Sequence, residues 1–113
     1  NQDKLTACKI VNPSTGKAVA PNATTIEDGS YAPFSRPLFI YVNARSARNP
    51  VCRSFVDFYL ANAGKMATLV GYVPLPKTMY ARVDKNWKAR RAGTQFLNEQ
   101  GDKVSGALTQ VYQ

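Results

Sequence analysis

The chain has 113 residues, which is enough for one compact domain or for a part of a larger protein. Its composition is that of a globular chain, with 44% hydrophobic, 11% aromatic and 19% charged residues, and it argues against intrinsic disorder. The formal net charge of +8 favours anionic partners such as nucleic acid, anionic lipid or small oxyanions, and the absence of histidine removes the commonest general base and metal ligand.

The N-terminal part is predicted to contain one strand, a loop and a very short helix. Residues 4–12 alternate partly between apolar and polar side chains, which indicates a strand with one wetter face. Residues 12–23 contain two prolines, a glycine and two asparagines, which are typical of a loop. We expect Thr24 or Thr25 to cap one or two helical turns that Gly29 ends.

The run "SRPLFIYVN", residues 35–43, predicts a strand over residues 38–42 whose side chains are apolar on both faces. Such a strand is typical of a parallel or mixed sheet that is covered on both sides. The helices that follow it supply part of that cover. We expect the rest to come from residues missing from this chain, from a companion chain or from a second copy, and the sequence leaves these open.

The next segment is predicted to form two helices. Pro50 suits the first turn of a helix. We expect Asn62 and Gly64 to interrupt it, and residues 65–71 to form a short second helix that Gly71 ends. The apolar face of the first helix contains Val51, Phe55, Phe58, Tyr59 and Asn62.

The C-terminal part is predicted to be an extended segment, a helix and a polar tail. The two prolines in residues 72–76 exclude a central strand there. Residues 77–93 form an amphipathic pattern, with Met79, Val83 and Trp87 on one face and Gly93 as its end. Residues 107–113 are expected to form a short strand or helix.

Candidate enzymatic residues are few. Of the seven carboxylates only Glu27 and Asp28 adjoin, and neighbours on a helix do not face each other, so we interpret this pair as charges of a helix N-terminus. Cys52 lies near a helix start, where a thiol pKa is often lowered, but without histidine we expect it to pack or to form a disulfide. The sequence therefore predicts no enzyme.

Cys8 and Cys52 lack the CxxC spacing of zinc and dithiol sites. They are interpreted either as one disulfide formed in an oxidising compartment or as two inert thiols, and the sequence leaves both open. The chain has no apolar run of about 18 residues and no signal peptide. Because it opens on Asn1 rather than Met, we expect it to be a piece of a longer precursor.

Two basic segments are candidates for anion binding. The run "KNWKARR", Lys85 to Arg91, places Trp87 among cations that could bind a nucleic acid, although Trp87 falls on the apolar face of its helix. In the run "RSARNP", Arg45 and Arg48 could hold an anion at the N-terminus of the next helix, and a solvated loop is the alternative. The glycine-rich GxxxxGK[ST] phosphate cradle does not occur.

Four short motifs in order carry a family resemblance. The run "VAPNATTIEDGSYAPFSRPLFIYV" resembles the C-terminal region of the phosphate-binding proteins of ABC transporters, of the PstS and SphX type. "FVDFYL", "VGYVPLP" and "GTQF" follow in the order and spacing typical of that family, so the resemblance extends from about residue 4 to about residue 104. Within the first run the agreement covers Pro21, Thr25, Ile26, Gly29, Tyr31 and residues 35–42.

The resemblance implies an α/β fold: part of a type II periplasmic-binding-protein fold, with a mixed sheet and packed helices. It implies that residues 1–12 are a strand from the end of the second lobe. Residues 13–34 would be the crossover loop with its short helix, and residues 35–113 the C-terminal part of the first lobe. The cysteine pair is not a feature of that family, so any bridge between Cys8 and Cys52 would be local to this protein.

The resemblance also implies a function. The complete protein would be periplasmic or extracytoplasmic, with membrane association possible, and would capture inorganic phosphate for the membrane subunits of an ABC importer, without cofactor, metal or catalysis. The family's main phosphate ligands lie upstream of this chain, in the remaining N-terminal part or a companion chain. Tyr31, Ser35 and Arg36 are the candidates for reaching the cleft. The alternative is a small basic nucleic-acid-binding domain, whereas the main interpretation expects no nucleic acid.

Overall fold

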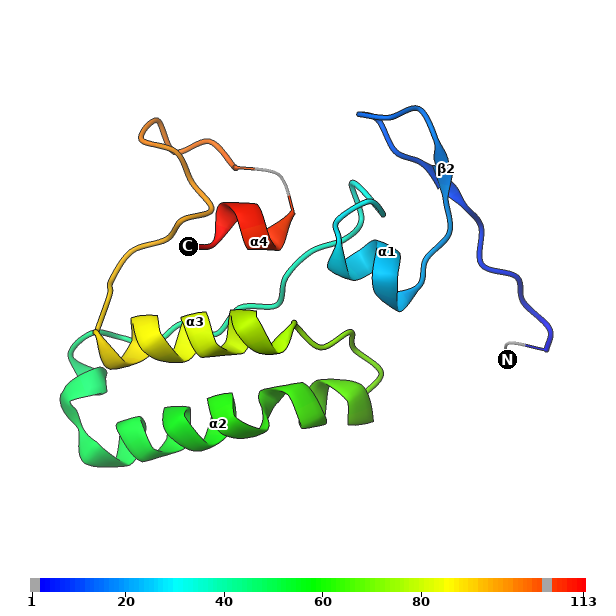
Figure 1. Ribbon diagram of the computed structural model, residues 1–113. Coiled ribbons are helices and arrows are strands. Elements are labelled where there is room, and N and C mark those ends of the chain that lie inside the picture. Colours follow the sequence, from blue (N-terminus) through cyan, green and yellow to red (C-terminus); the bar gives the residue numbers. More distant parts are fainter. Residues whose placement is uncertain (1–2, 105–106) are drawn as a thin grey trace.

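The structure is a computed structural model that describes residues 3–104 and 107–113, and its Cα extents are 47 × 38 × 20 Å. Figure 1 shows a hairpin of two long helices, with a small hairpin of strands and a short helix at one end. The elements are β1 (Ile10–Val11), β2 (Ala18–Val19), α1 (Ala23–Glu27), the 3-10 helix η1 (Ser46–Arg48), α2 (Pro50–Leu69), α3 (Lys77–Lys88) and α4 (Leu108–Val111).

The N-terminal strand is much shorter than predicted. Only Ile10 and Val11 are in a strand, and they pair antiparallel with Val19 and Ala18, which lie in the predicted loop. Gly16, at φ +67°, closes the turn between them. The prediction of a strand over residues 4–9 was wrong, because no partner strand lies beside them in the described chain. Residues 1–2 of the segment assigned to the second lobe lie outside the described residues.

The short helix α1 begins earlier than a Thr24 or Thr25 cap would allow. Asn22 is the N-cap, and its side chain accepts from the backbone N–H of Thr25, whose hydroxyl in turn accepts from the N–H of Asn22. Glu27 therefore lies in the last position of α1 rather than at its positive end, which corrects the prediction for the acidic pair. Gly29 follows at φ +77° and ends the helix as expected.

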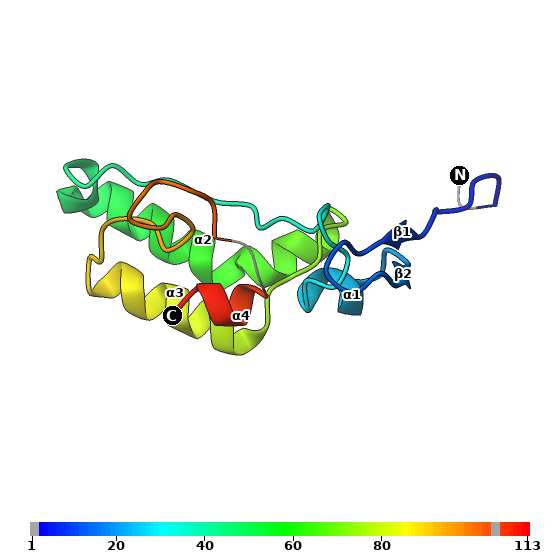
Figure 2. The ribbon, with the colours of Figure 1, turned by 90° about the horizontal axis from the view of Figure 1, so that it is seen from above.

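Residues 38–42 do not form the predicted strand. They run as an extended trace between α1 and η1 along the α2–α3 pair, with no strand beside them in either view (Figure 1, Figure 2). Leu38 is 77% exposed and Tyr41 is 90% exposed. The predicted mixed sheet is therefore not present in the described chain, whose one sheet is the β1–β2 pair, because the apolar run finds no hydrogen-bonding partner here.

Helix α2 is continuous over 20 residues, so the predicted interruption at Asn62 and Gly64 was wrong. The Asn62 side chain donates to the carbonyl oxygen of Phe58 on its own helix. A Cβ atom at Gly64 would lie 3.2 Å from the Tyr80 ring, so glycine allows α3 to approach closely. The helix ends with Gly71 at φ +80°, as predicted for the end of the second helix.

Helix α3 runs back along α2 after a turn at residues 70–71 and the proline-containing connection of residues 72–76, where no strand was expected. It ends at Lys88, earlier than predicted, because Arg90 adopts φ +53° and its N–H donates to the carbonyl of Trp87. The short helix α4 confirms the helical alternative for the tail. The buried hydrophobic residues of the described chain are only Ala47, Val56 and Met79, so the core is small.

Candidate functional site

The three predicted ligand candidates lie in the segment that follows α1. The backbone N–H of Tyr31 donates to the carbonyl of Thr25, and the N–H of Ser35 donates to the carbonyl of Tyr31, both at 2.8 Å. The Ser35 hydroxyl donates to the carbonyl of Ile26 at 2.7 Å. This segment is therefore folded back onto the C-terminal end of α1, where helix carbonyls lack partners within the helix.

The three candidates differ in what remains available for a ligand. Tyr31 is half-buried, with its ring centroid 6.3 Å from that of Phe34. The Ser35 hydroxyl hydrogen is already used by α1. Arg36 is exposed, and its guanidinium makes no hydrogen bond or ion pair with the described residues. Arg36 is thus the candidate whose donors are all open to an anion.

Asn12 is a structural centre that the sequence interpretation missed. Its side chain is buried and donates from Nδ2 to the carbonyl of Ser30 at 2.8 Å. Its Oδ1 accepts from the N–H groups of Ser14 at 2.8 Å and Thr15 at 3.3 Å. One side chain therefore joins the β1–β2 turn to the segment that carries Tyr31. The Asn-Pro dipeptide was a signal for the turn, but not for a partner 18 residues away.

The same segment contains a carboxylate with a perturbed pKa. Contacts of Asp28 with the hydroxyl and the backbone N–H of Ser30 hold the pKa of its carboxyl below the ordinary value. Because the carboxylate is fully exposed, this is a local turn contact.

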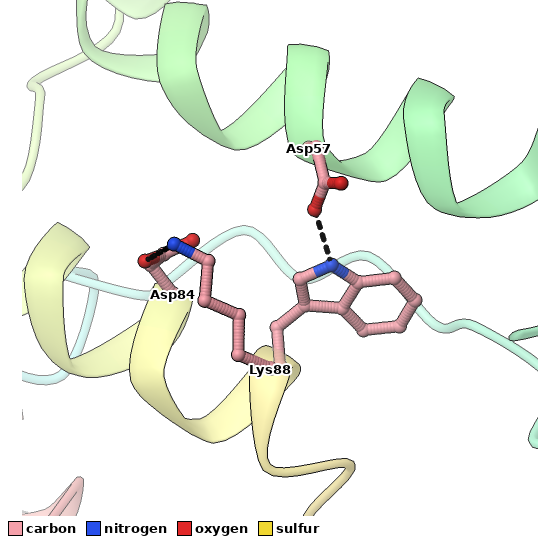
Figure 3. Close-up of polar contacts among 4 residues, drawn as sticks. Asp57, Asp84 and Lys88 are labelled. Carbon is pink, nitrogen blue, oxygen red and sulfur yellow. Dashed lines mark hydrogen bonds and ion pairs between the residues drawn. The ribbon is translucent and has the colours of Figure 1, made fainter.

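The seam between α2 and α3 contains the closest polar side-chain contacts of the helix hairpin (Figure 3). The Trp87 indole N–H donates to Asp57 Oδ1 at 2.7 Å across the two helices. On α3, Lys88 Nζ lies 2.7 Å from Asp84 Oδ2, and this contact raises the pKa of the lysine. Two shallow concavities of about 180 and 590 Å³ lie along the seam. Asp57 and Lys88 line both, and each already has a partner.

Several side chains of the basic helix and of the residues after it make contacts within the chain, whereas Lys85 and Arg90 are exposed. The half-buried Trp87 faces α2, as its place on the apolar face predicted. Arg82 donates to the backbone carbonyl of Tyr112, and Arg91 donates to that of Gln113. The Asn86 side chain donates to the Tyr112 hydroxyl at 3.0 Å. These groups hold the C-terminal segment against α3 and are not free for a nucleic acid.

The second candidate anion site, Arg45 and Arg48 at the start of α2, lies beside a helix end whose backbone groups are already bonded within the chain. Asn49 caps the helix by accepting from the N–H of Val51 at 2.8 Å. The Arg48 carbonyl accepts from the guanidinium of Arg53, and the side chains of Arg45 and Arg48 are exposed. The structure therefore has a solvated basic loop beside an already capped helix end.

Other kinds of site find little support in the described residues. Cys8 is exposed, Cys52 is half-buried, and both are free thiols, so the structure has no bridge between them. Within residues 3–104 and 107–113, no group of three or more metal-binding side chains comes together. None of the helices in those ranges has the length and hydropathy that a bilayer crossing requires.

Comparison with known proteins identifies relatives over most of the chain. It is 45% identical over 99 residues to the protein SphX of Synechococcus elongatus, covering 88% of this chain and 29% of that protein. The SphX of Synechocystis sp. is 44% identical over 100 residues, covering 87% and 30%. The phosphate-binding protein PstS of Staphylococcus aureus (strain USA300) is 44% identical over 98 residues, covering 79% and 29%.

These matches confirm the predicted resemblance to proteins of the SphX and PstS type. The similarity falls in the C-terminal part of the relatives, and the chain spans less than a third of their length. No family model matches the chain, and no solved structure matches it.

Proposed function

We propose, from its relationship to the phosphate-binding proteins SphX and PstS, that this chain is the C-terminal part of an extracytoplasmic protein that captures phosphate for an ABC importer. The similarity over 88% of the chain is the observation that carries the proposal. The function is binding and release in a closing cleft rather than turnover, so the protein is not an enzyme. Its partners are inorganic phosphate and the membrane subunits of the importer.

In this proposal the chain contributes to both lobes of a type II periplasmic-binding-protein fold. Residues 1–12 belong to the end of the second lobe, residues 13–34 form the crossover, and residues 35–113 complete the first lobe. In this division the Asn12 side chain joins the last residue of the second-lobe segment to Ser30 in the crossover. The main phosphate ligands lie in the part of the protein outside this chain.

Of the residues in this chain, we expect Arg36 to contribute most to binding of the anion. It is exposed next to a segment held on α1, and its five donors are unused by the described residues. Ser35 and Tyr31 position this segment through their contacts with α1. The net charge of +8 adds a long-range attraction for phosphate.

Calorimetry on the complete protein tests the proposal. Phosphate is expected to bind with a measurable heat, while the 113-residue chain alone is expected not to bind it tightly. Sulfate serves as the comparison anion. A complete protein that binds neither phosphate nor another oxyanion would refute the function, and tight binding by the isolated chain would refute the location of the main ligands.

A substitution tests whether Arg36 contacts phosphate, separately from whether the complete protein binds phosphate at all. Arg36→Gln removes a charged donor, whose loss is worth about 1.5–3 kcal/mol, so phosphate affinity should fall by about 10- to 100-fold. Arg90→Gln is the matched control, because Arg90 is also exposed and makes no side-chain hydrogen bond with the described residues. Equal affinities for the two variants would remove Arg36 from the site and leave the phosphate proposal standing.

The nucleic-acid alternative is not favoured by the geometry. Its stacking residue, Trp87, donates to Asp57, and Arg82 and Arg91 hold the C-terminal segment. Binding of a short oligonucleotide at low salt, with affinity falling steeply as salt is added, would support the nucleic-acid alternative.

A further inference from the structure

The positive charge of the chain is concentrated in two short runs of sequence. Residues 45–53 and 85–91, which we call the basic end, contain seven of the 15 cations and no carboxylate. The rest of the chain has eight cations and seven carboxylates, so it is nearly neutral, and the basic end accounts for almost all of the net charge of +8. The seven cations are Arg45, Arg48, Arg53, Lys85, Lys88, Arg90 and Arg91.

The fold brings the two runs together, because α3 ends where α2 begins. Figure 1 shows η1 and the start of α2 beside the end of α3, at the same end of the helix hairpin. The concavity of about 180 Å³ is lined from both runs, by Ala47 and Arg53 from one and by Lys88 and Arg90 from the other. All seven cationic residues are exposed, so the two runs form one basic surface.

Most hydrogen-bond donors of the basic end are unused by the chain. Three of the seven cations have partners: Lys88 pairs with Asp84, and Arg53 and Arg91 each donate to one backbone carbonyl. A guanidinium has five N–H donors and an ammonium has three, so even these side chains keep donors for another group. The cations whose side chains make no hydrogen bond or ion pair with the described residues are Arg45, Arg48, Lys85 and Arg90.

The basic end is separate from the segment that carries Arg36. Helix α2 has 20 residues and is therefore about 30 Å long. The basic end lies at its start, whereas α1 and the segment folded onto it lie toward its other end (Figure 1, Figure 2). The cations of the basic end are therefore too far away to contact an anion held at Arg36. Because unpaired cations are costly to remove from water, we expect the basic end to stay on the surface of the complete protein.

We propose that the basic end binds the anionic headgroups of a phospholipid bilayer and so holds the protein at the membrane surface. This inference rests on the proposed function, which assigns the complete protein to the outside of the cytoplasm and gives it membrane subunits as partners. Five of the seven cations are arginines, whose planar guanidinium groups match the oxygens of a phosphate. Anionic phospholipid headgroups present such phosphates close together on one surface.

The cations are spread over a face of the molecule instead of converging on one pocket. They come from the residues around η1, from the first turn of α2, and from the end of α3 with the residues after it. The concavity between them is also lined by the carboxylate of Asp57, which would repel a single bound anion. Near an anionic membrane surface each Lys or Arg raises affinity by about 5-fold, so a spread array gains from every headgroup that it meets.

A nucleic acid fits the basic end less well than a bilayer. Its bases would need an aromatic surface on which to stack, and Trp87 is the aromatic residue among these cations. The Trp87 indole is half-buried and donates to Asp57 across the seam with α2. Headgroup phosphates need no stacking partner, and the exposed guanidinium and ammonium groups are sufficient for them.

Vesicle co-sedimentation of the complete protein tests the binding. Vesicles of phosphatidylcholine and phosphatidylglycerol in equal parts, the mixed vesicles, should bind the protein. Vesicles of phosphatidylcholine alone should bind it at least about 100-fold more weakly. Added salt should release the protein from the mixed vesicles, because salt screens exposed charges. Equal binding to both kinds of vesicle, or binding to neither, would overturn the proposal.

Three substitutions made together test the location of the binding surface. Arg45→Gln, Arg48→Gln and Lys85→Gln remove exposed cations whose side chains make no hydrogen bond or ion pair with the described residues, so the helix content should not change. Affinity for the mixed vesicles should fall about 100-fold, which is about 5-fold for each cation. Phosphate affinity should be unchanged, because these residues lie far from Arg36. Unchanged vesicle affinity in this basic-end variant would refute the proposal.

The matched control removes the same charge from other parts of the surface. Lys17→Gln, Lys65→Gln and Lys77→Gln also take three exposed cations from the chain, and none of them belongs to the basic end. This control variant should lose less than about 5-fold in affinity for the mixed vesicles. Equal losses in the two variants would show that net charge alone matters and would refute the basic end as the binding surface.

Other partners and the proposed function give different results. A short oligonucleotide that binds more tightly than the mixed vesicles and is lost in the basic-end variant would overturn the bilayer in favour of a nucleic acid. Binding to phosphatidylcholine vesicles only when they contain the importer's membrane subunits would overturn it in favour of a protein. A complete protein that binds phosphate but not the mixed vesicles would refute this inference alone. One that binds the mixed vesicles but no oxyanion would refute the proposed function alone.

Discussion

The Asn12 side chain gives the sharpest test of the architecture, because one amide joins two segments that are far apart in sequence. Asn12→Ala removes its hydrogen bonds to Ser30, Ser14 and Thr15. Each of the two at 2.8 Å is worth about 1 kcal/mol net, and the longer one less, so the loss is about 2 kcal/mol. Amides protected by this contact should then exchange about 30-fold faster.

Asn12→Asp separates the bonds that the side-chain oxygen accepts from the bond that the side-chain nitrogen donates. The aspartate keeps an oxygen for the N–H groups of Ser14 and Thr15, but it places a second oxygen against the carbonyl of Ser30. Leaving that carbonyl without a donor costs about 1–3 kcal/mol. We therefore expect faster exchange at Tyr31, in the Ser30 segment, and little change in the β1–β2 turn.

The assay is residue-resolved amide exchange of the three proteins under identical conditions. Gly16, whose N–H donates to the Asn12 carbonyl at 2.8 Å, reports on the turn, and Tyr31 reports on the segment after α1. Asn22→Ala is the control for the turn reporter, because it removes a cap worth about 1 kcal/mol from α1 without touching Asn12. Exchange at Gly16 should not change in this variant, whereas Tyr31, whose N–H donates to Thr25 on α1, should exchange faster. An Asn12→Ala protein with unchanged exchange at both reporters would refute the argument that this side chain joins the two segments.

Three further predictions concern α2, α3 and the Asp28 turn. Gly64→Val should destabilise the helix hairpin by about 1–3 kcal/mol in denaturant unfolding, because its Cβ would lie 3.2 Å from the Tyr80 ring. Gly64→Ala should be within about 1 kcal/mol of neutral, since the gain in helix propensity offsets a smaller clash. Asp57→Ala should cost about 1 kcal/mol and shift the emission of Trp87, the single tryptophan; unchanged emission would contradict the hydrogen bond. The depressed pKa of Asp28 implies a contribution to folding stability that is fully present when the pH is above the ordinary pKa of 3.8. This contribution is lost as the pH falls through the lower pKa of the folded state. An NMR titration with a midpoint at or above 3.8 would contradict it.

Local rules located several helix ends from sequence alone. Pro50 in the first turn, Gly29 after α1 and Gly71 after α2 were predicted where they occur, because each follows from the backbone conformation of one residue. The same rules misjudged Gly64, which looked like a helix breaker and is instead the point where Tyr80 approaches α2. That role depends on a residue on another helix, which no local pattern contains.

The candidate site shows the same division. Tyr31, Ser35 and Arg36 were singled out by a family motif, and the structure joins Tyr31 and Ser35 by hydrogen bonds to α1 while Arg36 stays exposed. The sequence could not identify Asn12, because its partner Ser30 lies 18 residues away. It also could not show that Trp87 donates to Asp57 across two helices.

The sequence by itself determined the family resemblance, the amphipathic character of α3 and the apolar surplus of residues 38–42, because motifs, periodicity and hydrophobicity are written in the order of residues. Only the tertiary structure decided that those five residues have no strand partner in the described chain and that Val56 of α2 is buried while Phe55 and Phe58 stay exposed. Strand formation needs a second strand at hydrogen-bonding distance, and burial needs a second surface, so neither can be read from one segment.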